Sequence, residues 1–271
     1  MNPIATVIAE HVAQWRVPGQ PLIVGICGTQ ASGKSTAAEQ VAAHFTDQGL
    51  TIGVLGLDDL YLGRTARAIL AAETHPLYVT RGPAGTHDVA LGTATLDAVK
   101  AGKAVVLPRF DKRQDKPLPR EQWPTLAARC DVLLFEGWCV GAHPQPTTDL
   151  ANPVNSLESE DDPDGIWRTA INAHLAGPTG EMFSQIDRLI YLRPPSFDIV
   201  HTWRCEQERA YIATDVPGGA PAAMTDAQVA RFIAHYERTT RHIMDEMPHR
   251  ADLSVQLGPA RNVISTTRKP A

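Results

Sequence analysis

Cysteine is scarce in this sequence and is not arranged in pairs. The chain has four cysteines in 271 residues, at positions 27, 130, 139 and 205, and no Cys-x-x-Cys motif. This spacing excludes a disulfide framework and favours a reducing compartment, so we expect a cytoplasmic protein. Cys139 and His143 lie four residues apart, but a structural zinc site needs a second pair of ligands. We therefore assign no structural metal.

An excess of positive charge and a long apolar run are also absent. The chain has 25 Lys and Arg against 30 Asp and Glu, a formal net charge of −5, which leaves no broad basic surface for nucleic acid. No stretch approaches the roughly 18 apolar residues of a membrane span. Glu10, His11 and Arg16 interrupt the segment where a signal peptide would be apolar. We expect neither a nucleic-acid nor a membrane partner, and nothing in the composition indicates an oligomeric state.

The sequence does contain a succession of short apolar runs separated by helical patterns. The helical patterns cover residues 4–15, 34–45, 64–73 and 226–247. The apolar runs, each short enough for a buried strand, cover residues 22–27, 52–57, 104–107, 132–135, 189–192 and 253–257. This alternation predicts a three-layer α/β fold in which helices cover a mainly parallel sheet. Because no repeat or Gly/Ser linker divides the chain, residues 1–271 are expected to form one domain.

Residues 141–165 depart from this alternation. They contain four prolines and an acidic cluster, without apolar periodicity; the acidic residues are Glu158, Glu160, Asp161, Asp162 and Asp164. We expect a long solvated loop inserted in the domain, with a lid or binding segment as the alternative. The negative charge argues against direct contact with a triphosphate.

One segment, Gly28-Thr29-Gln30-Ala31-Ser32-Gly33-Lys34-Ser35, joins a predicted strand to a predicted helix and matches Gly-x-x-x-x-Gly-Lys-Ser. In such a loop, backbone N–H groups surround phosphate oxygens, and the following helix directs its positive end at the same charge. We expect residues 28–36, through Thr36, to bind ATP. The Lys34 ammonium would lie near the β- and γ-phosphates, and the Ser35 hydroxyl would ligate Mg²⁺. The loop predicts a bound nucleotide but no particular reaction.

Carboxylates follow two of the predicted strands. Asp58 and Asp59 stand at the end of the run 52–57, where the ligands of a parallel sheet are expected to gather. One would orient or deprotonate an acceptor hydroxyl, and the other would contact metal-bound water or a cation. A turn or helix cap is the alternative for this pair. Glu136 ends the run 132–135 and is expected to hold Mg²⁺ with Ser35.

Further charged side chains are candidates for substrate binding. In Arg81-Gly82-Pro83-Ala84-Gly85-Thr86-His87-Asp88, Arg81 would pair with an anionic acceptor and His87 would hydrogen-bond a hydroxyl or carboxylate. A second such segment is Pro108-Arg109-Phe110-Asp111-Lys112. A plain surface position is the alternative for these residues. Arg204, on a predicted helix, would close over the γ-phosphate, and an i,i+4 salt bridge with Glu208 is its alternative.

Taken together, these motifs resemble the plant-type D-glycerate 3-kinase family. The resemblance rests on residues 28–36, Asp58-Asp59-Leu60-Tyr61, residues 81–88, Phe135-Glu136-Gly137-Trp138 and Trp203-Arg204-Cys205-Glu206-Gln207-Glu208, in this order. The family is similar to uridine kinase, pantothenate kinase and phosphoribulokinase, so the resemblance implies a P-loop kinase fold. Leu60 departs from the pattern, since relatives commonly have an aromatic residue there. The acidic segment 155–167 is also similar to a segment of bacterial relatives.

The resemblance implies phosphorylation of D-glycerate by MgATP to give 3-phosphoglycerate and ADP. By position, Asp58 matches the base, ahead of Asp59, while Lys34 and Arg204 would stabilise the transferred phosphoryl group. The acceptor would be bound by Asp59, Tyr61, Arg81, His87, Asp88, Asp111 and Lys112. The nearest alternative is a kinase of another small hydroxyl compound, nucleoside-like or pantothenate-like. Outside this class, the alternative is a nucleotide-gated binding protein or hydrolase; the absence of an Asn/Thr-Lys-x-Asp pattern argues against a GTPase.

Overall fold

Six strands form the central sheet, and five of them are parallel. They are β1 (Leu22–Gly28), β2 (Ile52–Gly56), β7 (Val132–Gly137), β8 (Arg188–Arg193), β9 (Leu253–Leu257) and β10 (Val263–Arg268), in the spatial order β10-β9-β8-β1-β7-β2. β10 runs antiparallel to β9 at one edge, and the other neighbours pair in parallel. The computed structural model describes residues 1–126, 129–213 and 224–269.

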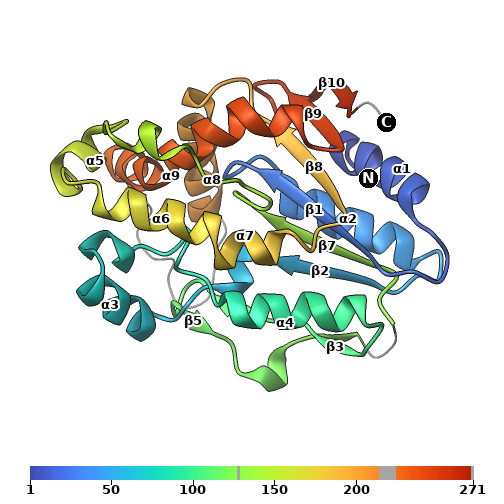
Figure 1. Ribbon diagram of the computed structural model, residues 1–271. Coiled ribbons are helices and arrows are strands. Elements are labelled where there is room, and N and C mark those ends of the chain that lie inside the picture. Colours follow the sequence, from blue (N-terminus) through green and yellow to red (C-terminus); the bar gives the residue numbers. More distant parts are fainter. Residues whose placement is uncertain (127–128, 214–223, 270–271) are drawn as a thin grey trace.

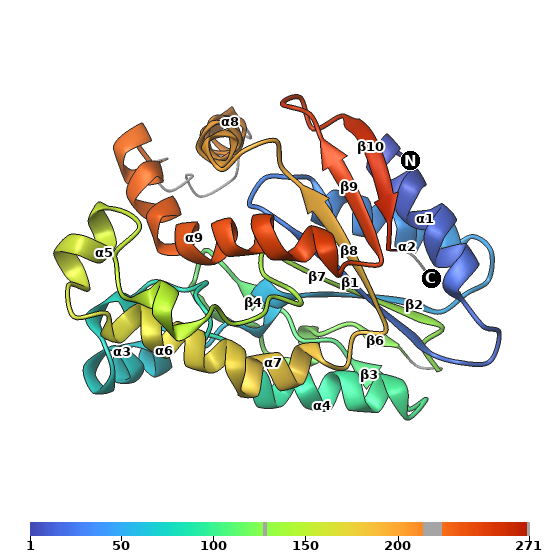
Figure 2. The same ribbon diagram turned by 45° about the horizontal axis from the view of Figure 1, so that its top comes forward.

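Helices cover both faces of this sheet, as Figures 1 and 2 show. On one face lie α1 (Pro3–Trp15) and α2 (Lys34–Thr46), and on the other lie α4 (Val89–Lys100), α6 (Ile166–Ala176), α7 (Pro178–Phe183) and α9 (Asp226–Glu246). The remaining helices are α3 (Arg64–Glu73), α5 (Ser156–Asp161) and α8 (Asp198–Ala213), with the 3-10 helices η1 (Leu57–Leu60), η2 (Pro76–Val79), η3 (Arg120–Gln122), η4 (Thr147–Leu150) and η5 (Met247–His249). The three-layer α/β fold predicted from the sequence is confirmed. No helix among the described residues is long and apolar enough to cross a membrane.

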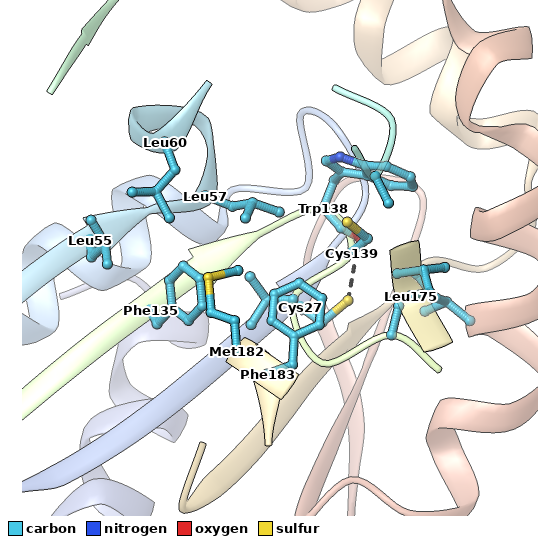
Figure 3. Packing of buried hydrophobic residues seen from close by; sticks show 14 of the residues in the cluster. Cys27, Leu55, Leu57, Leu60, Phe135, Trp138, Cys139, Leu175, Met182 and Phe183 are labelled. Carbon is cyan, nitrogen blue, oxygen red and sulfur yellow. Dashed lines mark hydrogen bonds between the residues drawn. The ribbon is translucent and has the colours of Figure 1, made fainter. Parts of the chain in front are cut away.

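Alternation along β1 explains why both faces carry helices. Val24 and Ile26 belong to the core cluster shared with α1 and α2, whereas Ile23 and Cys27 belong to the cluster shared with α4, α6 and α7. Every residue of β1 is buried, as expected for a central parallel strand. In the second cluster, drawn in Figure 3, Phe135 of β7 lies 6.1 Å from Phe183 of α7 between ring centroids.

Cys27, Cys130 and Cys139 belong to this core cluster, and Cys205 belongs to a separate, smaller one. Cys27 and Cys139 are drawn in Figure 3, where the Cys27 thiol donates to the carbonyl oxygen of Trp138 at 3.3 Å. Burial raises the pKa of the Cys27 thiol to about 12. All four cysteines are buried and unbridged. A buried thiol with such a pKa is a weak nucleophile, so the chemistry of this protein lies elsewhere.

One predicted strand does not join the central sheet. Of residues 104–107, only β3 (Val105–Val106) is extended, and it pairs antiparallel with β6 (Thr125–Leu126) in a separate two-stranded sheet. A third small sheet pairs β4 (Phe110–Asp111) with β5 (Lys116–Pro117). The run of apolar residues is cut short by Pro108, whose ring removes a ladder donor. The central sheet instead gains β10, which was missed because it is not an apolar run, although Val263, Ile264, Thr266 and Thr267 are β-branched strand formers.

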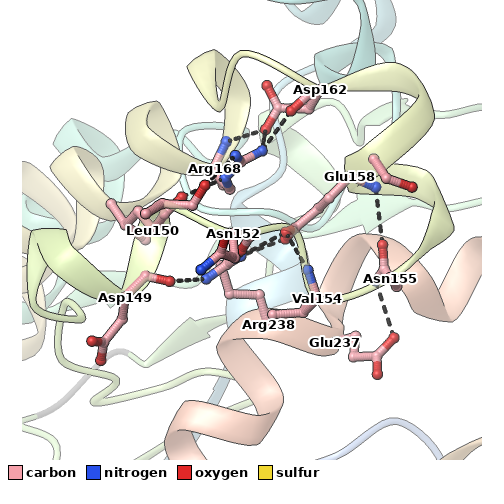
Figure 4. Close-up of polar contacts among 12 residues, drawn as sticks. Asp149, Leu150, Asn152, Val154, Asn155, Glu158, Asp162, Arg168, Glu237 and Arg238 are labelled. Carbon is pink, nitrogen blue, oxygen red and sulfur yellow. Dashed lines mark hydrogen bonds and ion pairs between the residues drawn. The ribbon is translucent and has the colours of Figure 1, made fainter.

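The acidic segment 141–165 is only in part the solvated loop that its composition predicts: Glu160, Asp161 and Asp164 are exposed, but two of its carboxylates are not. It contains η4 and α5, and the carboxylates of Glu158 and Asp162 are each only 1% exposed. Figure 4 shows the reason: Glu158 accepts from Arg238 Nε and Nη2 at 2.8 and 2.7 Å, and Asp162 accepts from Arg168 Nη1 at 3.0 Å. Ion pairs thus fix the segment to α6 and α9. Contacts of this kind are made by charged side chains, so the sequence of the segment shows no apolar periodicity.

Candidate active site

A cleft of about 770 Å³ lies where the parallel strands β1, β2 and β7 end. The loop after β1, Asp58 after β2 and Trp138 after β7 line this cleft, and residues of α8, of α9 and of the turn after β9 line its other side. The carboxyl edge of a parallel sheet is where ligands bind in open α/β folds. The predicted phosphate loop and the predicted base Asp58 therefore share one cavity.

The loop from Gly28 to Gly33 has the backbone of a phosphate cradle. Gly33 has φ +91° and precedes the first turn of α2, so its left-handed conformation brings the chain into the helix. A Cβ on Gly28 would lie 2.9 Å from Ser32 Oγ and 3.1 Å from Leu192 Cβ, so the tight turn requires glycine there as well. The hydroxyls of Thr29 and Ser32 are buried without a hydrogen-bond partner in the described structure. With the N-terminus of α2, they suit an anion.

Ser35 and Glu136 meet beside this loop. Ser35 Oγ donates to Glu136 Oε1 at 2.7 Å, and Lys34 Nζ lies 4.0 Å from Glu136 Oε2. The parallel register pairs Ile26 of β1 with Glu136 of β7 and so places Glu136 beside the loop that follows β1. Burial raises the pKa of Glu136, although the Lys34 ammonium and the Ser35 hydrogen bond oppose the shift. One hydroxyl and one carboxylate, completed by substrate phosphates, are a donor set that fits Mg²⁺.

Asp58 presents its carboxylate to the cleft with both oxygens engaged. The Tyr61 hydroxyl donates to Oδ1 at 2.5 Å, and Lys112 Nζ donates to Oδ2 at 2.6 Å. Burial alone would raise the pKa of Asp58, but the ammonium groups of Lys112 and Lys34 and these two hydrogen bonds lower it to about 2. The carboxylate is therefore ionised, and removing a cationic partner would raise its affinity for a proton.

Two arginines bring further positive charge to the cleft. Arg81 Nη1 donates to Asp115 Oδ1 at 2.9 Å. Arg204 pairs with Glu208 one turn along α8 and donates to Gln207 Oε1 at 2.8 Å. The side chain thus forms the i,i+4 salt bridge that was its alternative interpretation, and it also lines the cleft. Its role over the γ-phosphate stays a prediction.

Comparison with known proteins agrees with this geometry. No protein-family model matches the chain. An uncharacterized kinase, mug58 of Schizosaccharomyces pombe, is 32% identical over 229 residues, which are 80% of this chain and 79% of that kinase. The chloroplastic D-glycerate 3-kinase of Arabidopsis thaliana is 27% identical over 227 residues, 80% of this chain. The chain belongs to the D-glycerate 3-kinase family of P-loop kinases.

The share of each relative's length that this chain matches differs from one relative to the next. The chain spans 46% of the Arabidopsis thaliana protein, less than half its length. A solved structure of D-glycerate 3-kinase from Cryptococcus neoformans var. grubii is 24% identical, with a TM-score of 0.78 over 99% of this chain and 100% of that one. That likeness establishes a shared fold from end to end.

Asp59 of this kinase does not line the cleft, unlike its neighbour Asp58. It accepts from the backbone N–H groups of Gly56 and Phe110, each at 3.2 Å, and from Arg109 Nη1 at 3.4 Å. Burial raises the pKa of Asp59, opposed by Arg109 and these hydrogen bonds. The carboxylate connects η1 to the segment before Lys112. This geometry favours a structural role for Asp59 over the direct contact with the acceptor that was expected from the sequence.

Three other predicted acceptor ligands lie outside the lining of the cleft. His87 is 4% exposed and stacks on Tyr61 at 5.0 Å between ring centroids. Asp88 caps α4 by accepting from Leu91 N at 2.9 Å. Asp111 accepts from the N–H groups of Arg113 and Gln114 and so shapes the turn between β4 and β5. Among the predicted acceptor ligands, Tyr61, Arg81 and Lys112 line the cleft.

Several residues of the cleft were missed in the sequence. They are Arg113, Trp138, Phe232, Tyr236 and Arg261. Trp138 directly follows Glu136-Gly137 at the strand end, and the i,i+4 spacing of Phe232 and Tyr236 indicated a common face of α9. Arg261 gave no local signal, because only the pairing of β9 with β10 brings its turn to the phosphate loop.

Proposed function

We propose that this kinase transfers the γ-phosphoryl group of ATP to the 3-hydroxyl of D-glycerate, giving 3-phosphoglycerate and ADP. The observation that carries the proposal is the shared cleft, in which Asp58 faces the same space as Lys34 and Ser35. The relative named D-glycerate 3-kinase supports the choice of acceptor. The cations Lys112 and Arg81, which line this cleft, suit an acceptor that carries a carboxylate.

In this proposal, backbone N–H groups of residues 28–36 and the Lys34 ammonium hold the triphosphate. Ser35 and Glu136 hold Mg²⁺, which when bound would offset phosphate charge. Asp58 accepts the proton of the acceptor hydroxyl while the oxygen of that hydroxyl bonds to the γ-phosphorus. The bond between the γ-phosphorus and the bridging oxygen of the β-phosphate breaks, and ADP leaves with the electron pair. Arg204 stabilises the negative charge of the transferred group. We propose that residues 1–271 act as one kinase domain, working in the cytoplasm.

The test is a screen of ADP release in the presence of Mg²⁺ and single candidate acceptors. D-glycerate, L-glycerate, glycerol, uridine and pantothenate would be compared, and products would be identified by mass spectrometry. D-glycerate should give the largest acceptor-dependent rate, with a phosphoryl group on the 3-hydroxyl. ATP hydrolysis without any phosphorylated acceptor, or a clear preference for uridine or pantothenate, would contradict the proposal.

A further inference from the structure

Asp58, the proposed base, is held by a cation that can move away. Lys112 lies in the turn between β4 and β5, and its side chain is 56% exposed, whereas that of Asp58 is 37% exposed. Its Nζ is 2.6 Å from Asp58 Oδ2. A half-exposed lysine has a flexible stem and loses little by changing partners. The ion pair is therefore a contact that a ligand entering the cleft can exchange.

Three arginines of the cleft are paired with carboxylates that have no proposed role in the reaction. Arg81 pairs with Asp115, Arg204 with Glu208 and Arg261 with Glu206. Lys112, in contrast, pairs with the carboxylate that has to accept a proton. An ammonium on that oxygen opposes protonation, because it stabilises the charged form.

We propose that Lys112 recognises the carboxylate of the acceptor and that this recognition withdraws its ammonium from Asp58, releasing the base. The inference rests on the proposed transfer to a hydroxy acid and names the group that selects it. The acceptor's carboxylate replaces that of Asp58 as the partner of Lys112, so the ammonium keeps an anionic partner throughout. A neutral polyol offers no such replacement and leaves Asp58 paired.

Release of Asp58 from Lys112 raises its affinity for a proton, as a general base requires. The low pKa of Asp58 reflects Lys112 and Lys34 acting against burial. With Lys112 on the acceptor, burial acts on Asp58 with less opposition, and its pKa rises. The Tyr61 hydroxyl stays on Oδ1 and keeps the carboxylate oriented, with Oδ2 turned to the acceptor hydroxyl. The substrate class is thus a small hydroxy acid.

The same exchange protects ATP in the absence of acceptor. Without a carboxylate in the cleft, Asp58 stays paired with Lys112 and does not deprotonate a water molecule near the γ-phosphate. Removing the ammonium should therefore raise hydrolysis of ATP by water, an effect that a merely structural role of Lys112 would not produce.

The experiment compares Lys112→Met with Lys116→Met, a matched lysine that lies on β5 of the same hairpin, is exposed and does not line the cleft. Each enzyme is assayed with D-glycerate and with its neutral amide, 2,3-dihydroxypropanamide. The unaltered enzyme and Lys116→Met should prefer D-glycerate by at least about 100-fold in kcat/KM. In Lys112→Met the preference should fall below about 10-fold, with a raised KM for D-glycerate and an increased kcat for the amide. Lys112→Arg should restore part of the preference.

Acceptor-independent hydrolysis of ATP is the second readout, and it separates this inference from the proposed function. It should rise several-fold in Lys112→Met and stay unchanged in Lys116→Met. If the unaltered enzyme does not phosphorylate glycerate but Lys112→Met still raises hydrolysis, the acceptor is wrong and the release of Asp58 stands. An unchanged preference for D-glycerate in Lys112→Met overturns the inference, as does failure of both readouts. Unchanged melting and binding of an ATP analogue exclude misfolding as the cause of any loss.

Discussion

Arg261 is hydrogen-bonded to the phosphate loop through the backbone of Ala31. Its Nε donates to Ala31 O at 2.7 Å, and both residues have positive φ, 61° for Arg261 and 58° for Ala31. Such a backbone conformation costs a residue other than glycine about 1–3 kcal/mol and persists where neighbours enforce it. Arg261 also pairs with Glu206 at 2.8 Å and stacks over Trp203. The turn after β9 therefore braces the loop that binds phosphate.

Replacing Arg261 by methionine should weaken ATP binding more than it slows transfer. The loop would lose a charged hydrogen bond of about 1.5–3 kcal/mol, so we expect the KM for ATP to rise about 10-fold or more, with kcat within about 3-fold of normal. Steady-state kinetics at saturating acceptor would measure both. Glu206→Gln is the control, because it removes the ion pair and leaves the bond to Ala31. An unaltered KM for ATP in Arg261→Met would rule out the bracing role.

The two adjacent aspartates should give different results when each is replaced by asparagine. Asp58→Asn removes the proton acceptor and should lower kcat by about 10²- to 10⁴-fold, with ATP-analogue binding retained. Asp59→Asn loses a partner of Arg109 outside the cleft, and kcat should fall by less than about 10-fold. Kinetics and calorimetric titration of the two variants would measure this difference. The opposite order of losses would assign the base to Asp59.

Local signals predicted the elements that frame the site. Glycine, lysine and serine between an apolar run and a helical pattern located the loop after β1, and the predicted helix 64–73 coincides with α3. Carboxylates at strand ends gave Asp58 and Glu136, because a parallel sheet brings the ends of its strands to one edge. These features depend on residues close in sequence, or on a rule that applies to every parallel sheet.

Contacts between distant segments could not be predicted in the same way. Arg261 reaches Ala31 across 230 positions, and Glu158 meets Arg238 across 80. Asp58 and Asp59 are chemically identical in the sequence, and only the fold directs one to Lys112 and the other to Phe110. The acidic segment looked like a solvated loop because its partners are arginines on other helices. Such ion pairs leave no periodic apolar pattern.

His87 should make the stability of the protein depend on pH between about 4 and 6.5. Burial lowers the pKa of His87 from 6.5 to about 4, so its imidazole is neutral in the folded protein. The unfolded chain binds a proton there first as the pH falls, and stability is lost progressively over this interval. The loss from this one group is at most about 3 kcal/mol.

Replacing His87 by glutamine should therefore flatten the pH dependence of unfolding. Urea titrations at pH 7 and pH 4.5 would compare His87→Gln with the unaltered protein. His249→Gln is the control, because His249 is exposed. The variant without His87 is expected to lose less stability between the two pH values, whatever its stability at pH 7. An identical loss in all three proteins would refute this role.

Arg238 should be a structural support of the acidic segment and have little part in turnover. The Glu158 carboxylate is 1% exposed and accepts two hydrogen bonds from Arg238, which also donates to the carbonyl oxygens of Asp149 and Asn152 at 2.8 and 2.6 Å. Arg238→Met leaves a buried carboxylate without its cation and should cost about 3–5 kcal/mol of unfolding free energy. The double variant with Glu158→Leu should be less destabilised than the sum of the single variants.

Arg241→Met, on the same helix, is the matched control for this prediction. Arg241 is half-exposed and pairs with Glu237 one turn away, and such a pair contributes only about 0.3–0.5 kcal/mol. Chemical denaturation would give the unfolding free energies, and kinetics well below the melting temperature would give kcat and KM. Because neither Arg238 nor Glu158 lines the cleft, Arg238→Met should leave both constants within about 2-fold of normal. A large change in KM without loss of stability would instead make the segment a lid over the cleft.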